Sequence, residues 1–318
     1  MVYFLLLAAG FFPLIYGANL LVDNASSIAK RYNIPNIVIG LTIVAFGTSA
    51  PELVVNVFSA VSGNTGLALG NVIGSNIFNV AAILGVAAVI YPLTVKSGTT
   101  WIEVPLALLA GLLVFIMAND RLIDQSDNSV ITRIDGIILL VFFIIFLVYN
   151  FQMIRKGDYS EELEVKDRRP LIAALLIIAG LLLLVVGGRM IVYSAVKLAT
   201  LWGMHERLIG LTIVSIGTSL PELATSVVAA RKKNTDIAVG NIVGSNIFNI
   251  FFILGTTAVL APVPFQPAAQ VDILVNILVS LLLFAFIFTG KGRRVERWEG
   301  VIFLVVYLIY AGFLISQA

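Results

Sequence analysis

The chain has 318 residues, of which 59% are hydrophobic and 12% are charged, and its mean hydropathy is +1.03. These values exclude an ordinary water-soluble domain and predict an integral membrane protein. The net charge of +2 is spread over short segments without a basic block, which argues against nucleic-acid binding. The absence of cysteine excludes disulfides and thiolate metal sites.

Apolar runs long enough to cross a bilayer as helices recur along the whole chain. The first run, MVYFLLLAAGFFPLIYG, lacks the basic start of a signal peptide, so we expect a retained span. We predict ten helical spans, near residues 2–22, 36–61, 66–91, 101–118, 135–154, 171–192, 207–230, 237–261, 271–288 and 299–316. A charged linker, 155–170, separates a first five-span repeat, 1–154, from a second, 171–318.

The two halves share duplicated motifs at an offset of 170 residues. GLTIVAFGTSAPELVVNVFSA (40–60) matches GLTIVSIGTSLPELATSVVAA (210–230) at 13 of 21 positions, and GNVIGSNIFNV (70–80) matches GNIVGSNIFNI (240–250) at 8 of 11. Five spans is an odd number, so the second half must enter the membrane from the opposite side. Inverted repeats with interrupted helices at matching positions are typical of secondary transporters, whose sites lie where the repeats meet.

The charges of the loops predict the orientation. With both termini outside, the inner loops hold fifteen lysines and arginines, and the outer loops hold far fewer, Arg121, Arg133 and Arg207 among them. Positive residues favour the cytoplasmic side, so we expect both termini outside and the 155–170 linker in the cytoplasm.

Spans 2 and 7 each carry a proline inside an apolar helical pattern. Pro51 lacks an N–H, so the helix is expected to break just before it and to leave the carbonyls of residues 44–47 without partners. Thr48, Ser49 and Glu52 add hydroxyl and carboxylate oxygens beside the break, a donor set that suits a hard cation. The second half repeats this set with Gly217, Thr218, Ser219, Pro221 and Glu222.

Only Glu52 and Glu222, of the 18 acidic residues, fall well inside predicted spans, and a charge at this depth indicates function. Two converging carboxylates would balance one Ca²⁺ or two Na⁺. An empty, doubly negative site is costly to carry across the barrier, so we expect exchange rather than leak. The structural alternative is a capping box in which Ser49 and Ser219 cap helix starts. A glutamine would cap equally well without a buried charge, which favours the functional interpretation.

The second motif combines glycines with polar side chains. The Gly70-xxx-Gly74 spacing, repeated at Gly240-xxx-Gly244, predicts close helix packing. A serine and an asparagine four residues apart share one helix face. We interpret four of these polar residues as cation ligands, in preference to Asn76 and Asn246, although all six would also serve as hydrogen-bonding groups between helices. The four are Ser75, Asn79, Ser245 and Asn249.

Together, GTSxPE in spans 2 and 7 and GSNIFN in spans 3 and 8 resemble the cation/calcium exchanger superfamily, specifically the prokaryotic sodium/calcium antiporters. The resemblance covers the whole chain. It implies an all-α membrane protein of two inverted five-helix repeats with broken helices 2, 3, 7 and 8, in which spans 1 and 6 slide across the others. It also implies cation sites lined by Glu52, Glu222, Thr48, Thr218, Ser49, Ser219, Ser75, Ser245, Asn79 and Asn249, with backbone carbonyls at Ala45 and Ser215.

Two departures from relatives matter. Some relatives carry an aspartate where this chain has Asn249 or Asn79, and that charge is associated with potassium co-transport or altered ion occupancy. Animal relatives insert a large regulatory calcium-binding region between the halves, which the 155–170 linker is too short to provide. We therefore expect exchange of Na⁺ for Ca²⁺ that is independent of K⁺ and electrogenic.

A Ca²⁺/H⁺ exchanger is the nearest alternative, with Glu52 and Glu222 taking up protons on the return step. The extra threonine and serine oxygens favour sodium. A membrane-embedded hydrolase, with the two glutamates as acid and base, is a remote alternative, since the sequence offers no nucleophile setting. We expect no enzyme activity and no cofactor, a location in the cell (inner) membrane, the lipid bilayer as partner, and a monomer sufficient for transport.

Overall fold

The computed structural model describes residues 2–63, 65–123, 125, 129–156, 168–203, 215–267, 269–290 and 292–317. The α-helices are α1 (Val2–Arg31), α2 (Asn36–Ile39), α3 (Ala45–Thr48), α4 (Ala50–Val61), α5 (Gly66–Ile77), α6 (Gly85–Ile90), α7 (Val104–Met117), α8 (Asp120–Ile123), α9 (Arg133–Lys156), α10 (Pro170–Leu201), α12 (Ser215–Thr218), α13 (Leu220–Arg231), α14 (Thr235–Ile247), α15 (Gly255–Leu260), α16 (Ala269–Phe286) and α17 (Arg297–Gln317). Segments of π-helix are η1 (Gly40–Val44), η2 (Phe78–Leu84), η3 (Thr99–Glu103) and η5 (Phe248–Leu254), and the strands are β1 (Leu93–Thr94), β2 (Val130–Ile131), β3 (Val263–Pro264) and β4 (Arg294–Val295).

Eight helices of the described ranges are long and apolar enough to cross a membrane, and a bent pair, 36–48 with 50–61, makes a ninth. These nine correspond to every predicted span except the seventh. Residues 207–214 of that span lie outside the described residues, and the rest of it forms α12 and α13. The prediction of a helical membrane protein is confirmed.

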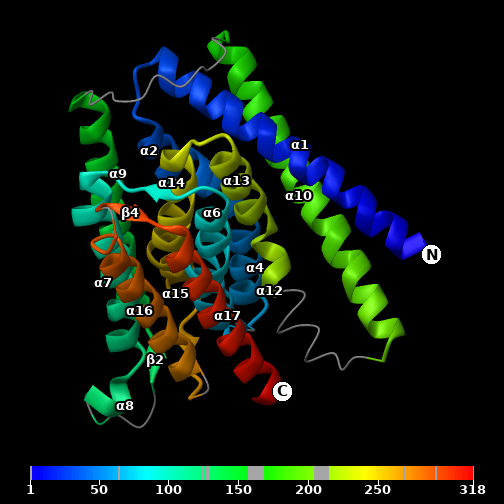
Figure 1. Ribbon diagram of the computed structural model, residues 1–318. Helices are drawn as coiled ribbons and strands as arrows, with labels where there is room; N and C mark the ends of the chain where they lie inside the picture. The colour runs from blue at the N-terminus through cyan, green and yellow to red at the C-terminus, as the bar shows by residue number, and fades with distance from the viewer. Residues whose placement is uncertain are drawn as a thin grey trace.

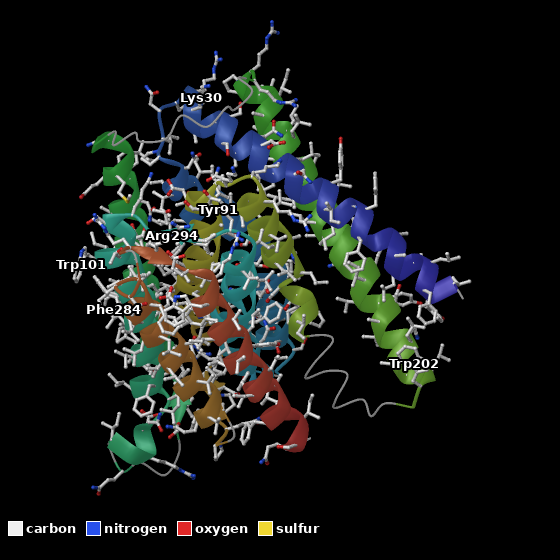
Figure 2. The ribbon with its side chains drawn as sticks, in the orientation of Figure 1. Lys30, Tyr91, Trp101, Trp202, Phe284 and Arg294 are labelled. Atoms are coloured by element: carbon white, nitrogen blue, oxygen red, sulfur yellow. The ribbon has the colours of Figure 1, made fainter. Side chains whose placement is uncertain are left out.

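Large apolar side chains cover the outside of the helical bundle. Trp101 and Trp202 are 60% and 69% exposed, and they project from opposite sides of the molecule in Figure 2. Many polar side chains are instead buried inside, Glu52, Thr48 and Asn241 among them. This distribution suits hydrocarbon surroundings, because polar groups in a membrane protein must find their partners within the protein.

The long helices α1 and α10 run antiparallel to each other along one side of the bundle (Figure 1). Glycines let their backbones meet. A Cβ added to Gly17 would lie 2.7 Å from the Gly180 carbonyl oxygen, and one added to Gly187 would lie 2.8 Å from that of Gly10. Gly180 and Gly187 stand 170 residues after Gly10 and Gly17, so the same contact is made twice, with the roles of the two helices exchanged.

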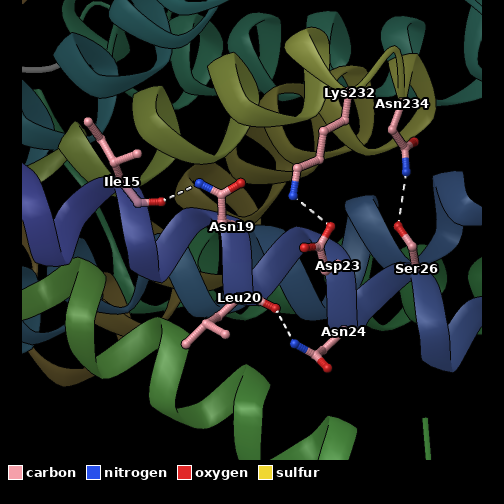
Figure 3. A network of polar contacts seen from close by, with 8 residues as sticks. All are labelled: Ile15, Asn19, Leu20, Asp23, Asn24, Ser26, Lys232 and Asn234. Atoms are coloured by element: carbon pink, nitrogen blue, oxygen red, sulfur yellow. Dashed lines mark hydrogen bonds and ion pairs between the residues drawn. The ribbon is translucent and has the colours of Figure 1, made fainter. Parts of the chain in front are cut away.

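The second half of α1 also contacts the turn between α13 and α14 (Figure 3). Lys232 Nζ lies 2.6 Å from a carboxylate oxygen of Asp23, and the Asn234 amide donates to Ser26 Oγ at 3.0 Å. These polar contacts hold α1 against one end of the bundle. The positions of α10 that are equivalent to Asp23 and Ser26 hold Tyr193 and Val196, so α10 lacks the aspartate and the serine that make these contacts.

Spans 3 and 8 are continuous helices, so the expectation that they are broken is wrong. Residues 68–90 and 235–260 each form one uninterrupted helix. Neither stretch contains proline, so no main-chain donor is lost. The departure from regular α-helix is instead a π-helical segment in each, η2 and η5, which starts directly after the GSNI sequence. Such segments often mark functional sites.

Two short antiparallel strand pairs link the halves of the chain. β1 pairs with β4, and β2 pairs with β3. β3 follows β1 at the 170-residue offset, and β4 follows β2 at an offset of 164. Each strand of one half therefore pairs with the counterpart of the other strand of that half, as expected for two similar units that face each other across a two-fold axis.

The helix α14 lies at the centre of the bundle (Figure 1), and all of its residues are buried. It packs against η1, α13 and η2. Gly240 and Gly244 permit this approach, since an added Cβ would lie 2.9 Å from the Ile37 carbonyl oxygen and 2.8 Å from Leu41, respectively. The packing role predicted for these two glycines is confirmed, and it brings the second motif of one half against the first motif of the other.

Candidate cation site

The prolines of spans 2 and 7 produce the breaks that the sequence predicts. α3 ends at Thr48 and α4 begins at Ala50, and the two parts of span 2 meet at 48°. Ser49 stands between them with φ −83° and ψ 5°. Ser219 separates α12 from α13 in the same way, with φ −90° and ψ 10°. Each proline lies in the first turn of the following helix, where its missing N–H is not needed.

The two serines at the breaks hydrogen-bond across the molecule instead of capping their own helices. Ser49 Oγ donates to Glu222 Oε1 at 2.9 Å, and Ser219 Oγ donates to Glu52 Oε1 at 3.2 Å. Neither serine side chain caps the helix that it precedes. The capping-box alternative is therefore wrong, and each half of the chain orients the carboxylate of the other half.

The carbonyls at the first break are better satisfied than expected. Ser49 N–H donates to the Ala45 carbonyl at 3.0 Å, and Thr48 Oγ1 also reaches it, at 3.3 Å. The expectation that this carbonyl is left without a partner is wrong, because the helical hydrogen-bond pattern continues to Ser49 before the chain turns. At the second break Ser219 N–H donates to Ile216 at 3.2 Å, one residue beyond Ser215.

Both glutamates are buried, with Glu52 0% and Glu222 1% exposed. Each carboxylate uses one oxygen to accept the bond from the opposite serine. The other oxygen, Oε2 in both residues, has no hydrogen-bond partner among the described residues. Buried polar atoms are nearly always paired, so two carboxylate oxygens without a donor indicate a place for a cation.

The second motif contributes four more buried oxygens of the same kind. Ser75 Oγ, Ser245 Oγ, Asn79 Oδ1 and Asn249 Oδ1 all lack a hydrogen-bond partner within the part of the chain that the structure describes. All four residues are at most 1% exposed. Asn79 belongs to η2 and Asn249 to η5. Hydroxyl, amide and carboxylate oxygens form the neutral-plus-anionic donor set that hard cations prefer.

Helix packing brings the two motifs together. α4, which carries Glu52, packs against η5, and α13, which carries Glu222, packs against η2. The crossed bonds of Ser49 to Glu222 and of Ser219 to Glu52 also hold the two carboxylates near each other. Thr218 ends α12, within hydrogen-bonding reach of the Glu52 carboxylate. The predicted ligands therefore cluster where the first motif of each half meets the second motif of the other.

One polar residue of this region was missed by the sequence reasoning. Asn241 is 0% exposed, and its Oδ1 accepts a bond from Thr48 Oγ1 at 3.0 Å. Its Nδ2 donates to Ser226 Oγ at 2.9 Å and to the Glu222 carbonyl at 3.3 Å. The signal that would have found it is the Gly-Asn pair that opens both copies of the second motif.

The equivalent network in the other half is open. Asn71 is the counterpart of Asn241, and Asn56 is the counterpart of Ser226. Asn71 Nδ2 and Asn56 Oδ1 both lack partners among the described residues. Gly70 is exposed and has nothing within 4 Å of an added Cβ among the described residues, so the predicted packing is confirmed only at its counterpart Gly240, which is buried against η1. Packing against η1 therefore closes the site on the α14 side, whereas residues 210–214, which correspond to η1 in the other half, lie outside the described residues.

Other buried carboxylates lie near the ends of helices and have protein partners. Glu103 accepts from the Tyr149 hydroxyl at 2.6 Å, and Asp236 lies 2.5 Å from Lys96 Nζ. Glu299 accepts from Thr289 and from the main-chain N–H of Glu296. These contacts join neighbouring helices and leave Glu52 and Glu222 as the carboxylates of the central cluster.

Comparisons with known proteins agree with this arrangement. The family described as "Sodium/calcium exchanger protein" matches residues 2–152 and 172–316. The chain is 39% identical to "Putative antiporter CaxA" of Alkalimonas amylolytica over 97% of both proteins. It is 32% identical to "Sodium/calcium exchanger MaX1" of Methanosarcina acetivorans, over 96% of this chain and 97% of that protein. A solved structure of the sodium-calcium exchanger NCX_Mj superposes with a TM-score of 0.79 at 32% identity and covers 96% of each chain.

This similarity extends over both halves of the chain, and it accompanies the same fold. The chain belongs to the sodium/calcium exchanger family. It is an integral membrane protein of the exchanger class, and its relatives are transporters rather than enzymes.

Proposed function

We propose that the chain is a secondary-active antiporter that exchanges Na⁺ for Ca²⁺ at the cluster of Glu52 and Glu222. The observation that carries the proposal is the pair of buried carboxylates, each oriented by the opposite serine and each with an oxygen left free of hydrogen bonds. Two negative charges match one Ca²⁺ or two Na⁺. The hydroxyl and amide oxygens would complete the shell of either ion, and the exchangers to which the chain is similar support this choice of ions. The proposed ligands are Glu52, Glu222, Thr48, Thr218, Ser49, Ser219, Ser75, Ser245, Asn79 and Asn249, with the carbonyls of Ala45 and Ser215.

The architecture that we propose is ten spans in two inverted repeats, 1–154 and 171–318, joined by the 155–170 linker. The reciprocal strand pairs and the reciprocal glycine contacts of α1 and α10 support a two-fold relation between the halves. With five spans in each half, that axis lies in the membrane plane.

Alternating access follows from the same symmetry. The α14 side of the cluster is closed by packing, and among the described residues the α5 side has fewer such contacts. An exchange of these two conditions between the halves would open the site to the other side of the membrane. We propose that α1 and α10 slide together over the remaining helices during this change, since their glycine contact makes them a close pair on one side of the bundle.

Proteoliposomes test the proposal directly. Purified protein should take up radiolabelled Ca²⁺ when Na⁺ is loaded inside and diluted outside, and uptake should stop when choline replaces internal Na⁺. An imposed pH gradient without Na⁺ should drive no uptake. Uptake driven by the pH gradient alone would contradict sodium coupling and favour proton exchange at the same two carboxylates.

A further inference from the structure

The asparagines Asn76 and Asn246 form a closed hydrogen-bonded ring between the two halves of the chain. The Asn76 amide donates to the main-chain carbonyl of Asn246 at 3.2 Å, and the Asn246 amide donates to that of Asn76 at 3.3 Å. Their own Oδ1 atoms accept from the other pair: Asn79 Nδ2 donates to Asn246 at 3.0 Å, and Asn249 Nδ2 donates to Asn76 at 3.0 Å.

This ring leaves each amide only one possible orientation. A main-chain carbonyl can only accept, so the end of the Asn76 side chain that faces Asn246 must be its NH₂ group. Its oxygen then faces Asn249, which must donate a hydrogen bond from its own NH₂ group. The Asn249 oxygen is left at the opposite end of that amide, without a hydrogen-bond partner among the described residues. The same reasoning fixes Asn79 through Asn246.

The orientation matters because the two ends of an amide have opposite chemistry. The oxygen binds a cation, whereas the NH₂ group repels it. An asparagine that is free to rotate would present either end. All four side chains are at most 3% exposed, so little water is available to replace a lost partner.

We propose that Asn76 and Asn246 are positioning residues that hold the amide oxygens of Asn249 and Asn79 toward the transported cation. The inference rests on the proposed function, since it assigns a cause to the ligand geometry of that site. Asn76 and Asn246 are not ligands themselves, because both polar ends of each side chain are used within the ring. Each half of the chain thus sets the ligand of the other half, as the two serines do for the glutamates.

The test compares Ca²⁺ kinetics in proteoliposomes for wild type and Asn76→Leu, which keeps the approximate size of the side chain and removes both polar ends. The KM for Ca²⁺ should rise about fivefold, as expected for the loss of one well-oriented neutral ligand, with a smaller change in maximal rate. Asn246→Leu is the equivalent variant in the other half and should behave alike. Asn150→Leu is a matched control: Asn150 is 2% exposed, and among the described residues it donates to the Phe146 carbonyl of its own helix.

The decisive comparison is made in the Asn249→Asp background. A carboxylate presents oxygen at both ends, so it needs no orienting partner. Adding Asn76→Leu to Asn249→Asp should then change the KM for Ca²⁺ by less than about twofold or lower it, because the Asn76 oxygen repels the new carboxylate. A purely structural role of Asn76 predicts the same fivefold rise in both backgrounds and would overturn the inference. A native KM in both Asn76→Leu and Asn246→Leu would also overturn it, whereas a wild type without Na⁺-dependent uptake would overturn the proposed function itself.

Discussion

Glu52 and Glu222 form no ion pair with the lysines and arginines of the described residues. Their hydrogen-bonding neighbours are neutral hydroxyl groups, which stabilise a carboxylate but leave its negative charge uncompensated. A buried, uncompensated charge is costly, so a cation is needed to stabilise the pair. The chemistry of the cluster therefore depends on charge at these two positions more than on shape.

Glu52→Gln and Glu222→Gln should each reduce Na⁺-driven Ca²⁺ uptake by at least about thirtyfold. Glutamine keeps an acceptor for the opposite serine and removes one negative charge, so the protein should still fold. Thr48→Ala and Ser219→Ala remove only a neutral oxygen and should weaken apparent Ca²⁺ affinity about two- to tenfold. Initial rates of uptake into proteoliposomes, at several Ca²⁺ concentrations, measure both effects.

Glu103→Gln is the control for the loss of a buried charge. Glu103 is 0% exposed and contacts Tyr149 near the end of a helix, outside the proposed site. Its variant should keep uptake within about twofold of wild type. Equal losses in Glu103→Gln and Glu52→Gln would show that charge removal simply damages the protein, and the two-carboxylate site would be abandoned.

The sequence predicted much of this cluster because prolines, acidic residues and duplication are local signals. The break before Pro51, the burial of Glu52 and the neutral ligands beside it all follow from spacing within one motif. The hydrogen-bond partners of these groups do not follow from the spacing within one motif. Ser49 bonds to Glu222 and Thr48 bonds to Asn241, contacts across more than 170 residues that depend on how the halves pack.

At the scale of helices, the two copies of the second motif have nearly the same sequence and different surroundings. α14 is buried throughout, and its Asn241 links Thr48 to Ser226. In α5 the counterpart Asn71 has an unpaired amide nitrogen within the described residues. Identical residues with different partners are expected when one sequence supports two conformations of similar energy.

Asn241→Ala should shift the protein away from the conformation described here, and Asn71→Ala should favour it. The first variant removes the hydrogen bonds that close the α14 side, and the second removes those that we expect to close the α5 side in the opposite conformation. A cysteine at Gly70 reports the change, because the native chain has none and this position is exposed, with nothing within 4 Å of an added Cβ among the described residues. The rate at which an impermeant maleimide labels the cysteine at position 70 should fall about threefold or more when Asn241→Ala is added. The same rate should stay unchanged or rise when Asn71→Ala is added instead.

A cysteine at Ser62, in the exposed turn after α4, controls for general changes in reactivity and should label equally in all backgrounds. Equal labelling at position 70 in both asparagine variants would remove the link between these networks and access to the site.

The sequence could not show the helical details of spans 3 and 8. An apolar pattern fixes which face is buried, but it does not distinguish α-helical from π-helical hydrogen bonding over one or two turns. Asn79 and Asn249 lie in the wider turns of η2 and η5, so the geometry of two proposed ligands depends on a feature that only the structure shows.

For the whole molecule, the loop charges predict that the turn after α4 lies outside the cell and that the turn after α13 lies inside. Cysteines at Ser62 and Arg231, both exposed, test this orientation. An impermeant maleimide applied to intact cells should label position 62 and leave position 231 unlabelled until the membrane is permeabilised. Labelling of position 231 alone in intact cells would reverse the topology, and labelling of both would indicate a mixed orientation that contradicts the charge argument.

The net charge of the loaded site decides how transport responds to voltage and to potassium. Glu52 and Glu222 supply two negative charges, and Asn79 and Asn249 add only neutral oxygens. Ca²⁺ balances this charge, so a K⁺ ion bound beside it would be a cation without a third carboxylate, which is unfavourable in a low dielectric. A third Na⁺ in the returning state would give the site a charge of +1.

Exchange should therefore proceed without K⁺ and, if more than two Na⁺ replace each Ca²⁺, should move net charge. An inside-negative potential would then favour Na⁺ entry and Ca²⁺ extrusion by about 2.3 kcal/mol per net charge per 100 mV. The measurement is Na⁺-driven Ca²⁺ flux in vesicles without K⁺, repeated with valinomycin and K⁺ gradients that only set the voltage. Flux that stops without K⁺ would contradict the first expectation, and flux indifferent to voltage the second. Asn249→Asp adds a third negative charge, so it should change the ion preference or the voltage dependence, because the loaded site then needs one more cation to be neutral.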